Sequence, residues 1–146
     1  MAVDARELSA EEIRDVNARY HDVAAAEYDA KWGIDFGDTG QEQVRLKLVK
    51  ALGGRRGESF GDALEIGSGT GYFSLNLVQL GVIERLTATD ISPGMLKRLS
   101  ATADSLGVSD VTTVATEAEA LPFADESFDL VFGHAVLHHI PDLDRA

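Results

Sequence analysis

The segment ALEIGSGTGYF, residues 63–73, constrains the fold of this chain more than any other. It places three glycines, Gly67, Gly69 and Gly71, between two apolar runs. Glycine inside a regular element costs about 0.5–1 kcal/mol relative to alanine, so three glycines within five residues need a structural reason. A buried strand that turns tightly into a helix supplies one, because the turn needs left-handed backbone and lets a ligand approach backbone N–H groups.

Strand and helix patterns alternate along the rest of the chain. The expected order after the strand at 63–66 is a helix over 71–81, a strand over 85–89, a helix from Ser92 to Gly107, and strands over 111–115 and 128–132. Such alternation is typical of right-handed crossovers between parallel strands. The sequence therefore predicts an α/β sandwich.

The first 60 residues carry a helical pattern instead. Ser9 and Glu12 have capping-box spacing ahead of one or two amphipathic helices over 10–30. Thr39 and Glu42 repeat that spacing ahead of a helix that ends at 53–54, a glycine pair. We therefore expect a helical cap or lid over 1–60 and an α/β core over 61–146.

Composition narrows the class of protein. The net charge of −12 disfavours nucleic acid as a partner, since phosphate binding relies on Lys and Arg. The chain has no cysteine, which excludes disulfides and thiolate metal sites, and we expect no metal centre. No run approaches the roughly 18 apolar residues of a membrane span, and the acidic start lacks a secretory-signal pattern. These features predict a cytoplasmic protein that binds small molecules.

The glycine spacing leaves the ligand open. A P-loop would need a lysine after its second glycine, and a dinucleotide turn would need its third glycine one residue later than Gly71. Asp90 closes the second strand, where a carboxylate suits the two hydroxyls of a ribose or caps a turn. Glu117 follows the third strand, where it either holds an adenine amino group or belongs to an acidic surface loop. The apolar turn over 121–123 could cover a ring.

Four segments taken together are more specific: LEIGSGTGYFS, TATDISPGML, ATEAEALPFADESFDLVF and HAVLHHIPD. In this order, over residues 62–142, they resemble the class I S-adenosylmethionine-dependent methyltransferases, in particular the subgroup related to quinone-biosynthesis methyltransferases. The resemblance implies a Rossmann-like parallel sheet with strand order 3-2-1-4. It also implies S-adenosylmethionine as methyl donor, S-adenosylhomocysteine as product and a small-molecule acceptor.

The resemblance also implies residue roles. Contacts to the methionine moiety are expected from the first strand and the glycine loop, at Glu65, Gly67, Ser68, Gly69 and Gly71. Asp90 is expected to bind the ribose hydroxyls and Ile91 to lie against the adenine. Met95, in the next helix, is also expected to contact the cofactor. Glu117 is expected on the adenine amino group, with Ala118 giving a backbone contact. His134 is expected near the reacting methyl, and the lid candidates are Tyr20, Tyr28 and Trp32.

Catalysis depends mainly on positioning, because a sulfonium methyl is already electrophilic. His134, His138 and His139 are the candidate catalytic residues, with the adjacent pair 138–139 as candidate general bases. Two other functions stay open. One is a non-catalytic S-adenosylmethionine-binding module or assembly partner, and the other is a nicotinamide dehydrogenase, which the early third glycine weakens.

The family fold normally continues beyond HHIPD with the rest of that helix, a fifth strand, another helix and an antiparallel hairpin. We therefore expect the 146 residues to belong to a longer protein, or to be a shortened form or the ordered part of one. The fourth strand would then be an edge with an exposed LVF run. Self-association through this strand, or cover by a partner, is the expected consequence.

Overall fold

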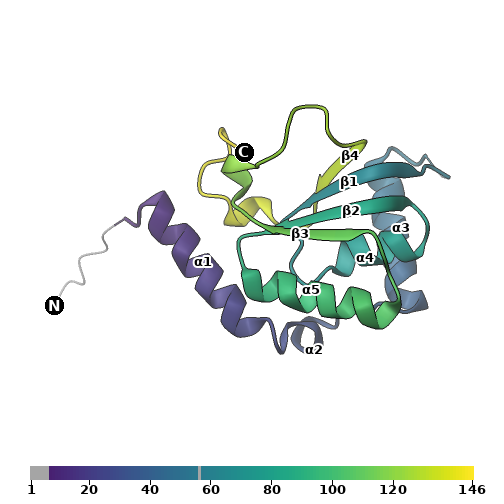
Figure 1. The fold of residues 1–146 in the computed structure, drawn as a ribbon, viewed down its shortest axis with the longest axis horizontal. Helices are drawn as coiled ribbons and strands as arrows, with labels where there is room; N and C mark the ends of the chain where they lie inside the picture. Colours follow the sequence, from purple (N-terminus) through teal and green to yellow (C-terminus); the bar gives the residue numbers. More distant parts are fainter. Residues whose placement is uncertain (1–6, 56) are drawn as a thin grey trace.

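The computed structural model describes residues 7–55 and 57–146. Four strands form one sheet in the order β3-β2-β1-β4 (Figure 1). They are β1 Phe60–Ile66, β2 Ile83–Asp90, β3 Val111–Ala115 and β4 Leu130–Gly133. Every pair is parallel, so the predicted parallel sheet and its strand order are confirmed.

The strand ends shift slightly from prediction. β1 begins three residues earlier than expected, because the Phe60 N–H donates to the Val82 carbonyl at 2.7 Å and starts the pairing with β2. β4 begins later, at Leu130, which pairs with Ala63.

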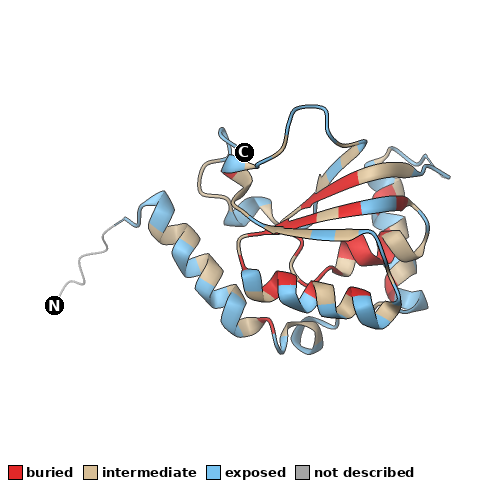
Figure 2. Cartoon of the chain, viewed as in Figure 1, coloured by how far each residue is buried: buried red, intermediate tan, exposed pale blue. Residues whose placement is uncertain are grey.

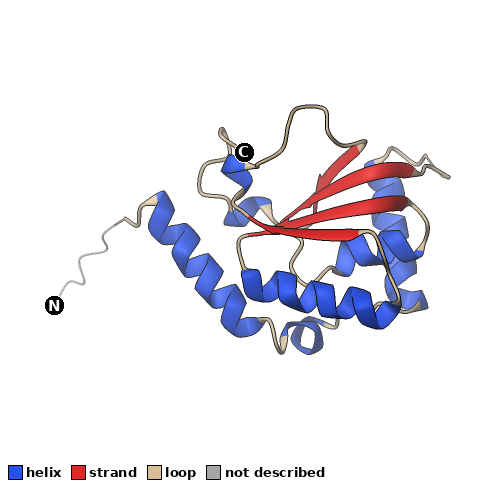
Figure 3. Ribbon diagram, viewed as in Figure 1, coloured by secondary structure: helices blue, strands red, loops and turns tan. Residues whose placement is uncertain are grey.

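The helices are α1 Ala10–Ala24, α2 Tyr28–Trp32, α3 Asp38–Ala51, α4 Tyr72–Gln79 and α5 Pro93–Leu106. Two short 3-10 turns, η1 Ala118–Ala120 and η2 Leu137–His139, follow β3 and β4. Figure 3 shows α3, α4 and α5 gathered along the sheet, with α1 and α2 projecting beside them. The prediction of one or two helices over 10–30 is confirmed.

The core lies between the sheet and α3, α4 and α5. Ala63, Leu86 and Ala88 of the sheet share it with Leu75 of α4 and Leu99 of α5. Figure 2 shows the buried positions concentrated on the two central strands and on the helices facing them. Because alternate strand residues face opposite sides, β4 turns Val131 away from this core, and Val131 is 54% exposed.

Helix α3 belongs to the same core. Its Val44 and Leu48 are buried there, and its contact with α4 joins it to the sheet. Of the three helices in the predicted lid, α3 thus belongs to the core, which leaves α1 and α2 as the helices that could cover a site. The predicted boundary near residue 60 stays a prediction.

The two expected capping boxes differ in outcome. Ser9 and Glu12 cap α1 reciprocally, as predicted. The box at Thr39 is wrong, because α3 begins at Asp38 and Thr39 already lies inside its first turn. Asp35 satisfies the free amides there instead, accepting from the Gly40 N–H at 2.7 Å.

No helix within residues 7–55 or 57–146 combines the length and apolar character that crossing a membrane requires.

Candidate functional site

A cavity of about 430 Å³ opens at the carboxyl ends of the parallel strands. Ligands of open α/β sheets bind at this edge, because the loops that leave the strands diverge there. The cavity collects most of the predicted site residues: Glu65, Gly67, Ser68, Gly69, Asp90, Ile91, Met95, Glu117, Ala118, His134 and His139. Tyr28 and Trp32 of α2 also line it.

Two glycines of the loop between β1 and α4, Gly67 and Gly69, have different surroundings. Gly67 has φ of 65°, and a Cβ atom built there would lie 2.1 Å from Val136 Cγ2, so close packing forces glycine at this position. Gly69 has φ of 54°, yet a Cβ would meet nothing within 4 Å. The backbone at Gly69 therefore faces free space, which leaves room for a ligand.

Gly71 lies behind this loop. It is the N-cap of α4, with φ of 92°, and its surroundings are Leu75 and Leu99 of the core. It does not line the cavity. The structure therefore gives Gly71 a packing position behind the lining of the cavity, and its contact to the cofactor stays a prediction.

Glu65 is a buried acid on the central strand β1. It lines the cavity and is 1% exposed, and within the described part of the chain its Oε1 has no hydrogen-bond partner. Burial raises the pKa of Glu65 to about 8, and the nearby Asp90 carboxylate adds to the rise, while the Ser74 hydroxyl opposes it. A cationic group entering the cavity would supply the missing partner and favour the ionised form.

Asp90 is held rigidly at the end of β2. Its Oδ2 accepts from the Gly69 N–H and its Oδ1 from the Ser92 N–H, each at 2.9 Å. Ser92 in turn caps α5, and its hydroxyl accepts from the Met95 N–H at 3.1 Å. A carboxylate has about four lone-pair sites, so Asp90 keeps acceptor capacity for ligand hydroxyls.

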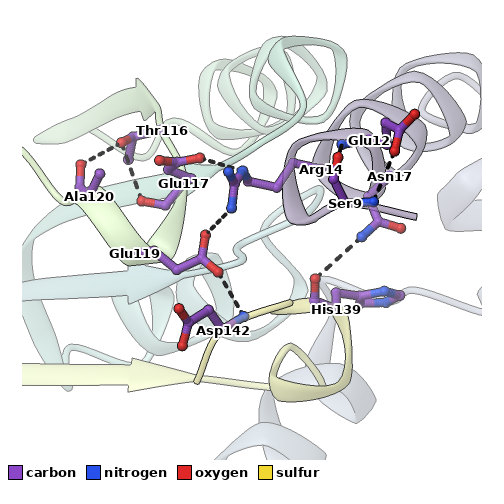
Figure 4. A network of polar contacts seen from close by, with 10 residues as sticks. All are labelled: Ser9, Glu12, Arg14, Asn17, Thr116, Glu117, Glu119, Ala120, His139 and Asp142. Carbon is purple, nitrogen blue, oxygen red and sulfur yellow. Dashed lines mark hydrogen bonds and ion pairs between the residues drawn. The ribbon is translucent and has the colours of Figure 1, made fainter. Parts of the chain in front are cut away.

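Glu117 lies at the cavity wall after β3, and its partner comes from α1. Arg14 Nε contacts Glu117 Oε2 at 2.7 Å, and Arg14 Nη1 contacts Glu119 Oε2 at 2.6 Å (Figure 4). Sequence reasoning missed Arg14 and Glu119. Arg14 and Glu119 lie 105 positions apart, and an arginine on an exposed helix pattern carries no signal of its partner.

Two of the three candidate catalytic histidines reach the cavity. His134 stacks on Phe73, with centroids 5.0 Å apart, and its Nε2 lies 3.3 Å from Lys47 Nζ. Burial lowers the pKa of His134, and the Lys47 charge lowers it further. The pKa of His139 falls through burial, then through His138 and His21, with Asp90 opposing. His138 contacts the His139 ring but does not line the cavity.

Tyr20 lies outside the lining of the cavity, and its role as a lid residue stays a prediction. The side chain is 55% exposed and does not line the cavity, whereas the next residue, His21, does. One residue turns an α-helix by about 100°, so His21 and Tyr20 point in different directions. Of the three aromatic lid candidates, Tyr28 and Trp32 reach the cavity.

A parallel sheet with a cavity at the carboxyl ends of its strands defines the class of open α/β proteins that bind ligands at this edge. Comparisons with known proteins specify the family. A family model described as a methyltransferase domain matches residues 64–146. Since this is more than half of the chain, the chain belongs to the S-adenosylmethionine-dependent methyltransferase family.

Individual relatives agree with this assignment. A malonyl-[acyl-carrier protein] O-methyltransferase of Methylococcus capsulatus is 42% identical over 86 residues, which cover 57% of this chain and 30% of that protein. A demethylmenaquinone methyltransferase of Thermobifida fusca is 35% identical over 102 residues, covering 70% and 41%. The chain thus spans less than half the length of these relatives.

A solved structure confirms the fold. Phosphoethanolamine N-methyltransferase 2 of Haemonchus contortus, in complex with phosphomonomethylethanolamine and S-adenosylhomocysteine, superposes with a TM-score of 0.71 at 24% identity. The match covers 95% of this chain and 32% of the other. The predicted class I, Rossmann-like fold is therefore confirmed.

Proposed function

We propose that this chain carries the donor-binding part of an enzyme that transfers a methyl group from S-adenosylmethionine to a small organic acceptor, releasing S-adenosylhomocysteine. Family membership supports the reaction type. Two relatives are named as methyltransferases of demethylmenaquinone and of a malonyl group, which supports an organic methyl acceptor for this chain as well. The acidic charge of this chain favours an acceptor that is neutral or cationic.

The unpaired Oε1 of buried Glu65 carries the proposal. Glu65 lines a cavity shared with Asp90 and Gly69, and a Cβ atom built at Gly69 would meet no described atom within 4 Å. The methyl donor has an ammonium group for Glu65, ribose hydroxyls for Asp90, and an adenine amino group for Glu117. Ile91 would lie against the adenine, and Ala118 would add a backbone contact. Ser68 and Met95 complete the wall.

The donor supplies an electrophilic methyl group when bound. The chain has to orient donor and acceptor in line and exclude water, a positioning effect worth up to about 7–11 kcal/mol. Tyr28 and Trp32 cover the cavity from α2 and serve the exclusion of water.

His134 and His139 are the proposed bases for an acceptor that must lose a proton. Their lowered pKa values keep both rings neutral at pH 7, and a neutral imidazole accepts a proton. His138 would act on His139 and not on the acceptor, since it lies outside the cavity.

The cellular location and the partners of the protein are also proposals. The cysteine-free, acidic sequence supports a cytoplasmic protein without nucleic-acid partners. β4 at the edge of the sheet supports self-association through that strand.

Calorimetric titration tests the donor site directly. S-adenosylhomocysteine should bind the chain with one-to-one stoichiometry, and NAD should give no comparable heat. Binding of NAD without any response to S-adenosylhomocysteine would overturn the proposal. Transfer of a labelled methyl group to quinol and carboxylate acceptors, followed by mass spectrometry, then tests the reaction itself.

A further inference from the structure

We propose that Arg14 is a positioning residue for the adenine end of the donor site, and that it couples closure of α1 to recognition of the donor. The inference rests on the proposed function, because it concerns the same cavity. It assigns to the N-terminal helix a role in choosing the nucleoside base, beyond covering the site.

The guanidinium of Arg14 joins two carboxylates that follow β3. Its Nε contacts Glu117 at 2.7 Å and its Nη1 contacts Glu119 at 2.6 Å (Figure 4). The Arg14 side chain is 20% exposed and that of Glu119 is 1% exposed, so the bridge is shielded from solvent. A planar guanidinium binds two groups in fixed directions, and a lysine ammonium has no such geometry.

Glu119 anchors this bridge to the rest of the molecule. Its second oxygen, Oε1, accepts from the Asp142 N–H at 2.8 Å, which joins η1 to the segment after β4. Nearby, Asn17 of the same helix donates to the His139 carbonyl at 3.3 Å. α1 is therefore fixed both to the loop after β3 and to the segment that carries His139.

Glu117 is the more exposed member of the pair. Its side chain is 34% exposed, and it lines the cavity together with Arg14. Arg14 engages Oε2, and the carboxylate keeps acceptor sites for a further donor. Arg14 thus fixes the direction in which Glu117 presents those sites to an amino group on the ligand. When α1 moves away, this orientation is lost.

The test compares two nucleoside ligands on variants of the intact chain. The first is S-adenosylhomocysteine, and the second is its inosine analogue, in which an oxygen replaces the adenine amino group. Arg14→Gln should reduce the preference for the adenine ligand about tenfold, the size of one charge-assisted hydrogen bond. Arg19→Gln is the matched control, since Arg19 lies on the same helix with its side chain 83% exposed. It should leave the preference unchanged.

The ratio of the two affinities separates positioning from simple docking. If Arg14 only anchored α1, R14Q would lower the affinity for both ligands equally. A preference for the adenine ligand that is unchanged or increased in R14Q would therefore overturn the inference and leave the proposed donor site intact. A parent chain that binds neither ligand would overturn the proposed function and the donor-directed role of Arg14 with it.

A measurement without ligand checks the closure. Hydrogen exchange should accelerate across residues 10–24 in R14Q and not in R19Q, because the bridge to η1 is gone. Equal exchange in both variants contradicts the coupling. If R14Q fails to fold, Arg14→Lys carries the same comparison, since it keeps the charge and loses the planar fork.

Discussion

Glu65 is the residue at which burial and ligand binding conflict most directly. The residue is 1% exposed, and among the described residues one of its oxygens has no hydrogen-bond partner, so burying this acid costs free energy of folding. Replacing it by leucine would suit the core, yet a cationic ligand would lose its counter-charge. Sites that bind charged ligands commonly hold such perturbed acids.

Glu65→Gln tests this conflict through pH. Burial raises the pKa of Glu65 to about 8, above its ordinary 4.5, so the ligand-free chain loses stability as pH rises through about 8. Urea unfolding at pH 5 and pH 9 should show this loss in the parent and a smaller one in E65Q. Affinity for S-adenosylhomocysteine should rise with pH toward 8 in the parent and stay weak and flat in E65Q.

An exposed acid provides the control for that experiment. Glu84 lies on β2 with its side chain 68% exposed. Glu84→Gln should follow the parent in both measurements. A pH dependence that is the same in E65Q and the parent would assign the titration to another group.

Gly67 provides a second prediction at the residue scale. Gly67→Ala adds a Cβ that would lie 2.1 Å from Val136, in addition to the strain of φ at 65°. Gly69→Ala carries a similar φ of 54° without any contact inside 4 Å. Left-handed strain costs about 1–2 kcal/mol, and overpacking adds about 1–3 kcal/mol.

Denaturant unfolding should therefore show G67A as the less stable variant. Adding Val136→Ala to G67A should restore part of the loss, because it removes the 2.1 Å contact with Cγ2 and leaves the 2.8 Å contact with the Val136 Cβ. Equal stability of G67A and G69A would mean that the loop relaxes away from Val136.

At the scale of the element, α3 shows how a helix start is decided outside the helix. Asp35 precedes the helix and accepts from the Gly37 and Gly40 N–H groups. Its backbone carbonyl accepts from Asn76 of α4, so the same residue joins α3 to α4. Thr39 and Glu42 have the residue types and spacing of a capping box. The helix begins at Asp38, however, so Thr39 lies inside the first turn and cannot be the N-cap residue.

Asp35→Ala should lower the free energy of unfolding by about 0.5–2 kcal/mol, as for other lost caps. Thr39→Ala should change it little, because the Thr39 side chain is exposed and caps nothing. Thermal unfolding of the two variants beside the parent measures the difference. A larger loss in T39A than in D35A would restore Thr39 as the cap.

At the scale of the whole molecule, β4 is one of the two edge strands of the described sheet, with β3 at the other edge. Val131 on β4 is 54% exposed, and an apolar edge strand pairs readily with another chain. Charge on the edge prevents such pairing in natural sheets.

Val131→Lys should therefore reduce self-association. Sedimentation at increasing concentration should show association of the parent and its loss in V131K, with unchanged circular dichroism. Val23→Lys is the control, since Val23 is 86% exposed on α1, away from the sheet edge. A parent that stays monomeric throughout would contradict the role proposed for β4.

The strand order and the role of Glu65 followed from the resemblance of four segments to a known family. The sequence by itself determined the alternating strands and helices of a parallel sheet and the acidic residues Asp90 and Glu117 that follow two of its strands. These follow from local signals: hydrophobic period, glycine turns and the ends of runs, each set within a few residues. The left-handed turns and the Ser92 cap belong to the same class of local information.

Only the tertiary structure decided which side chains meet. Arg14 reaches Glu117 and Glu119 across more than 100 positions, and Gly67 is dictated by Val136 from a distant loop. Likewise, His21 and not Tyr20 faces the cavity, because docking fixes the rotation of α1. Such pairings depend on how elements are oriented in space, and the chemistry of a single residue carries no record of its distant neighbour.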